Sequence, residues 1–97
     1  MELRVVLKYC PEDVSDSGVP VFLICYNTEG PAPYLRCTTL PANLDIERII
    51  PTRDLEYVEA LLRDIDVASK ASREAALLLL SRLEAIAFGP IRCSQNT

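Results

Sequence analysis

The chain has 97 residues, of which 49% are hydrophobic and 25% are charged, and its formal net charge at pH 7 is −4. These proportions are typical of one globular domain and exclude a disordered chain. Its ten Lys and Arg residues are scattered along the sequence, whereas a surface for nucleic acid or an anionic membrane needs clustered cations. We therefore expect neither nucleic acid nor a membrane as a partner.

The sequence also predicts a cytoplasmic protein. Its first residues, MELRVVLKYC, include an acidic side chain and no long apolar run, so they do not have the pattern of a signal peptide. The apolar segments, such as residues 75–80, are far shorter than the roughly 20 residues that span a bilayer.

The chain has no His and four Cys, and this combination restricts its chemistry. Catalytic sites built on a Ser–His or Cys–His pair are excluded. Because Cys10, Cys25, Cys37 and Cys93 form no C-x-x-C pair, we favour free thiols in a reducing compartment over a zinc site made of four dispersed cysteines. We predict no catalytic residue, no metal and no cofactor.

Two N-terminal segments have the composition of strands. Residues 2–10 alternate between apolar and polar side chains, which predicts a half-buried strand. Residues 19–26 are continuously apolar, which predicts a central strand buried on both faces. The acidic loop between them, residues 11–18, has oxygen-bearing side chains at spacings similar to those of a calcium loop. Ile24 stands where such a loop needs its bidentate Glu, so we interpret the segment as a solvated loop.

Residues 34–39 (YLRCTT) predict a third strand, which a turn and a Pro-rich loop join to the second in a β-hairpin. A hairpin centred near Pro31 would place Cys25 opposite Cys37, close enough for a disulfide. These two residues are therefore a candidate redox pair, although cytosolic disulfides are rare.

From residue 52 onward the chain predicts helix, with apolar residues at steps of three and four between residues 55 and 65. This pattern lapses over residues 66–72, and a second apolar helical segment stops at Gly89 and Pro90. One helix over 52–88 would be roughly 55 Å long, too long for a compact domain of this size. We predict two helices at about 52–66 and 72–88, followed by a short strand at 91–93.

Residues 77–80 are four consecutive leucines, which cover more than one face of a helix because successive residues turn by about 100°. One side is expected to cover the sheet, and the other to meet the first helix or a second protein molecule. Exposed apolar surface usually marks an interface, and a well-packed monomer that buries it is the alternative. The candidate interface residues are Leu77, Leu78, Leu79 and Phe22.

Three cations near the strands form a second candidate site. Arg4, Lys8 and Arg36 would converge on an anion if the first two strands are neighbours with matching faces. This arrangement predicts, as an alternative function, a domain that binds a small anion or a nucleotide.

Three segments have counterparts, in the same order, in one bacterial protein family. They are Lys8-Tyr9-Cys10-Pro11-Glu12, similar to an Arg-Tyr-x-Pro-Asp-like motif, then the apolar run 19–26, and then the acidic, leucine-rich segment 54–62. In this respect the chain resembles an uncharacterised family of small domains encoded beside serine kinases of the toxin–antitoxin type. That family has no assigned activity, so the resemblance implies no catalytic residue.

Together these observations predict one α+β domain, with a small antiparallel sheet of three or four strands and two antiparallel helices on one face. Whether the first strand joins the second or the third stays open. We predict a small cytoplasmic interaction or accessory module without its own catalysis, which binds a protein partner or a second copy of itself.

Overall fold

The computed structural model describes residues 3–10 and 18–94 of the chain. Within these residues it contains four strands and three helices. The predicted acidic loop lies outside the described residues except for Gly18. The strands are β1 (Leu3–Tyr9), β2 (Val19–Tyr26), β3 (Leu35–Thr39) and β4 (Ile91–Cys93), and the helices are α1 (Ile46–Ile49), α2 (Thr52–Ala71) and α3 (Arg73–Glu84).

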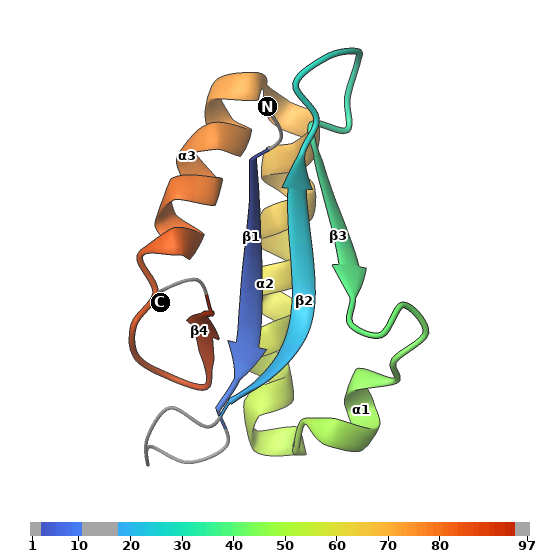
Figure 1. The fold of residues 1–97 in the computed structure, drawn as a ribbon, viewed down its shortest axis with the longest axis vertical. Coiled ribbons are helices and arrows are strands. Elements are labelled where there is room, and N and C mark those ends of the chain that lie inside the picture. Colours follow the sequence, from blue (N-terminus) through green and yellow to red (C-terminus); the bar gives the residue numbers. More distant parts are fainter. Residues whose placement is uncertain (1–2, 11–17, 95–97) are drawn as a thin grey trace.

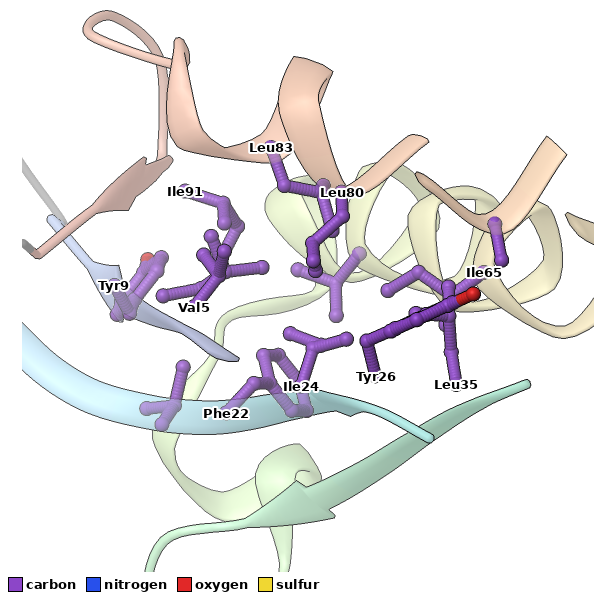
Figure 2. Packing of buried hydrophobic residues seen from close by; sticks show 14 of the residues in the cluster. Val5, Tyr9, Phe22, Ile24, Tyr26, Leu35, Ile65, Leu80, Leu83 and Ile91 are labelled. Carbon is purple, nitrogen blue, oxygen red and sulfur yellow. The ribbon is translucent and has the colours of Figure 1, made fainter. Parts of the chain in front are cut away.

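The strands form one antiparallel sheet in the order β3-β2-β1-β4 (Figure 1), so β1 lies between β2 and β4. The two long helices, α2 and α3, pack side by side against one face of this sheet (Figures 1 and 2). The predicted α+β fold is therefore confirmed. No helix in the described part of the chain is long and apolar enough to cross a membrane.

The core lies between the sheet and the two long helices, as Figure 2 shows. Alternate residues of β1 and β2 face the helices because successive side chains of a strand point to opposite faces. Among the described residues sixteen apolar side chains are buried, and most of those in the helices recur at the expected helical spacing. Large, completely buried side chains come from both layers, the sheet and the helices, and include Leu7, Phe22, Ile24, Val58, Leu83 and Ile91.

A hydrogen bond between side chains attaches β1 to the start of α2. The Tyr9 hydroxyl donates to Asp54 Oδ2 over 2.7 Å. Burial raises the pKa of Tyr9 to about 12, and the carboxylate of Asp54 adds to this shift. The phenol therefore stays protonated at neutral pH and remains a donor.

The break between the long helices lies at Ser72, later than the sequence predicted. Ser72 has extended backbone (φ −166°, ψ 165°), and its hydroxyl accepts a hydrogen bond from the Ala75 N–H over 3.0 Å, which caps α3. The first helix thus runs to Ala71 rather than to residue 66. The second helix ends at Glu84 rather than at residue 88, and Gly89 follows with a φ of 93°.

Candidate functional site

A buried serine of α2, Ser69, forms hydrogen bonds with the first residue of the edge strand β3. The Ser69 hydroxyl accepts a hydrogen bond from the Leu35 N–H over 3.1 Å and donates one to the Leu35 carbonyl oxygen over 2.9 Å. The Tyr34 N–H also donates to the Ser69 carbonyl oxygen over 2.8 Å. Ser69 therefore occupies the position that a further strand would take beside Leu35.

The rest of that edge is open. Backbone N–H and C=O groups of alternate strand residues point to the same side, so those of Cys37 and Thr39 point away from β2, as those of Leu35 do. Because β3 is the last strand of the sheet, no strand lies beside them. Within residues 3–10 and 18–94 these groups have no hydrogen-bond partner. The open edge thus presents two donors and two acceptors.

A groove of about 420 Å³ lies beside this edge, between β3 and α2. Phe22, Leu35, Leu62 and Ile65 give it an apolar lining. Lys70 and Asp66 stand at its rim, where Lys70 Nζ lies 3.2 Å from Asp66 Oδ1. An exposed ion pair of this kind contributes little stability, so it leaves the apolar lining as the main feature of the groove.

The hairpin register differs from the predicted one by one residue. Cys25 pairs with Arg36, and Cys37 pairs with Ile24. Directly paired residues share a face, so the two cysteines lie on opposite faces of the sheet and the candidate redox pair is not brought together. The physical reason is Leu35, which is buried opposite Tyr26 and fixes the register through its inward side chain.

The thiol of Cys37 lies at the groove, and its environment makes it a poor nucleophile. Although the residue as a whole is exposed, burial of the thiol raises its pKa from 9.0 to about 11. The thiolate is the reactive form of a cysteine. At neutral pH, Cys37 is therefore suited to packing rather than to nucleophilic chemistry.

We predict that iodoacetamide alkylates Cys37 about tenfold more slowly in the folded protein than in urea-unfolded protein at pH 7.5. Burial raises the pKa of the thiol to about 11, and the loss of thiolate outweighs the higher reactivity of the more basic thiolate. Peptide mass spectrometry over time would measure both rates. Since the unfolded thiol ionises near pH 9 and the folded one near pH 11, this group lowers stability as the pH rises through that window. Equal rates in the two states would contradict the prediction.

The predicted interface residues lie in different environments. Phe22 is only 1% exposed and belongs to the core, so it is not available to a partner. Leu79 is partly buried and packs against the core. Leu77 and Leu78 are 39% and 57% exposed, so Leu78 is the more outward of these two leucines.

The predicted anion-binding residues share the face of the sheet that the helices leave uncovered. Arg4 and Arg36 both pair with Cys25, one from each side, so the three residues form a row across β1, β2 and β3. Lys8 lies further along β1, where it pairs with Arg92 of β4. Of these three cations only Arg36 lines the groove beside β3, so the groove does not bring them together.

Sequence reasoning missed three features of this region: Arg92 on the uncovered face, Ser69 beside β3 and the open edge itself. Ser69 could have been found as a small polar residue at a position of α2 that continues the apolar stripe. Arg92 lies on the strand predicted at 91–93, but only the pairing of β4 with β1 places it beside Lys8.

Comparisons with protein-family models, with curated proteins and with solved structures found no match to this chain. Among the described residues, no cluster of three or more Cys, Asp or Glu side chains is arranged to hold a metal ion. The candidate site consists of the groove, the open edge of β3 and the uncovered face of the sheet.

Proposed function

We propose that this chain is a protein-interaction module without its own catalysis, and that it forms a dimer by pairing β3 with β3 of a second copy. One observation carries this proposal: the backbone groups of Cys37 and Thr39 point outward from the edge of the sheet and have no partner among the described residues. An open edge of this kind binds another strand through main-chain hydrogen bonds.

The open edge is complementary to itself. If two copies run antiparallel about a two-fold axis at Thr38, Cys37 of each copy lies opposite Thr39 of the other. Each of these pairs exchanges two hydrogen bonds, so four bonds form and all the outward donors and acceptors of both copies are satisfied. This register leaves the bonds between Leu35 and Ser69 intact.

The groove favours the same location. In that pairing, Thr39 of the second copy is on the side of the sheet that faces the groove of the first, next to Cys37. Burial of apolar surface at the groove would add to the hydrogen bonds, which alone contribute modestly. The exposed leucines of α3 are the competing location for an interface.

Sedimentation equilibrium of wild type, Cys37→Pro and Cys37→Ser would test this proposal. Proline removes the outward N–H of Cys37 but no hydrogen bond to β2, so it should be tolerated in this edge strand. We expect a wild-type dimer, at least tenfold weaker dimerisation for Cys37→Pro, and dimerisation within threefold of wild type for Cys37→Ser. Circular dichroism would verify that both variants are folded.

Two results would overturn the proposal. The first is a wild-type protein that stays monomeric up to millimolar concentration. The second is a dimer that Cys37→Pro leaves intact and Leu78→Glu dissociates, which would place the interface on α3 instead.

A further inference from the structure

Charge is distributed unevenly between the two layers of the fold. The described strands contain four basic residues and no Asp or Glu, although the whole chain has a net charge of −4. In contrast, α2 has five acidic and three basic residues. All four strand cations are on the face that the helices leave uncovered, since Arg4 and Arg36 pair with Cys25, and Lys8 pairs with Arg92.

The uncovered face has cations at both ends and aliphatic side chains in the middle. Arg4 and Arg36 mark one end, and Lys8 and Arg92 mark the other, roughly 13 Å away because strand residues rise about 3.3 Å each. Between them, Val6 pairs with Leu23, and both are partly exposed. A polar rim around an apolar centre is the usual organisation of a protein–protein interface.

The chemistry of this face distinguishes between classes of anion. Arg4 and Arg36 are separated by two strand spacings, roughly 10 Å, on a flat surface, so the face is wider than one phosphate group needs. Single-stranded nucleic acid is held by aromatic side chains on which bases stack. The aromatic residues within the strands, Tyr9, Phe22 and Tyr26, are all buried. An extended acidic protein surface with an apolar centre therefore fits this face better than a single phosphate group or a single-stranded nucleic acid does.

We propose that the uncovered face of the sheet binds an acidic amphipathic helix of a partner protein. Helices pack well on sheet faces, as α2 and α3 do on the other side. On an α-helix, carboxylates seven residues apart lie on nearly the same side, because seven steps of about 100° make almost two full turns. They are separated by roughly 11 Å along the helix axis, a span that long Arg and Lys side chains can match, with aliphatic residues between them over Val6 and Leu23. Arg36 belongs to β3, but its side chain is on the uncovered face with that of Cys25, whereas the proposed dimer forms through outward main-chain groups of Cys37 and Thr39. A helix on this face and a strand at the edge of β3 are therefore compatible.

Two synthetic helical peptides of identical composition would test the proposal. In the first, pairs of Glu seven residues apart flank Leu and Ala on one face; in the second, the same Glu residues are moved to the opposite face. Fluorescence anisotropy should give a dissociation constant at least tenfold lower for the first peptide. The affinity should fall as salt is added, because charge pairs at the rim are screened.

Variants of equal charge would locate the site. Lys8→Glu with Arg36→Glu should weaken binding of the first peptide at least tenfold, whereas Arg48→Glu with Arg63→Glu, on α1 and α2, should change it less than threefold. Circular dichroism would verify that both double variants are folded. The proposal is overturned if both peptides bind equally, if both double variants weaken binding equally or if neither peptide binds at millimolar concentration. Displacement of the first peptide by an equal charge of oligo-dT would overturn it too, in favour of nucleic acid.

Discussion

Replacing Phe22 with Ala should lower the free energy of unfolding by about 3–5 kcal/mol, the usual cost of removing a large aromatic side chain from a core. Phe22 is 1% exposed and is the largest of the completely buried side chains. Removing its ring would reduce the buried apolar surface and would also leave a cavity between the sheet and α2. Urea denaturation followed by circular dichroism would measure the change.

Leu78→Ala is the matched control, because Leu78 is 57% exposed and its truncation should change the free energy by less than about 0.5 kcal/mol. If Phe22→Ala does not fold, the milder Phe22→Leu should still give a measurable loss. If Phe22→Ala kept wild-type stability but self-associated more weakly, the buried position of Phe22 would be contradicted. The sequence-based prediction that Phe22 is an interface residue would then be supported.

Replacing Ser69 with Ala should cost about 2–4 kcal/mol. The hydroxyl satisfies both the N–H and the C=O of Leu35, and all these groups are buried. A buried donor or acceptor left without a partner costs about 1–3 kcal/mol. Urea denaturation would measure the loss, and amide hydrogen exchange should show that the Leu35 N–H exchanges faster relative to the core.

Ser81→Ala on the exposed side of α3 is the control, with an expected change below about 0.5 kcal/mol. If Ser69→Ala retained wild-type stability and a protected Leu35 amide, the hydroxyl would not be the group that satisfies this part of β3. An intact stability with a fast-exchanging amide would instead mean that the lost bonds have a low net energy.

The sequence was sufficient to predict the layers of the fold because one face of each element is buried. Alternation along β1 follows from the side chains that the helices cover. The helices cover only one face of β2 as well, and Leu23 and Cys25 on the other face are partly exposed, so the prediction of a strand buried on both faces is wrong. The hairpin register could not be obtained in the same way. It depends on whether Leu35 or Arg36 faces the helices, and a loop of several residues is compatible with both.

The helix boundary and the candidate site depend on contacts between distant residues. The apolar stripe lapses after Ile65, so the sequence favoured an early end, yet Ser69 continues the helix because it bonds to β3. The basic residues are scattered in the sequence and gather only because antiparallel pairing places Lys8 beside Arg92 and Arg4 near Arg36. The spacing of these residues in the sequence does not predict which strands pair or in which register.

The hydrogen bonds between Ser69 and Leu35 at the edge of β3 also affect the tendency of the protein to aggregate. Exposed strand edges template amyloid-like growth, and proteins limit it by keeping such edges short. With Leu35 covered, only two residues of β3 offer outward backbone groups, and β4 at the opposite edge has three residues in all. The two-fold pairing proposed for β3 would be a closed association in which each open edge is used once. Such a pairing would let the sheet bind one further strand without continued growth into a fibril.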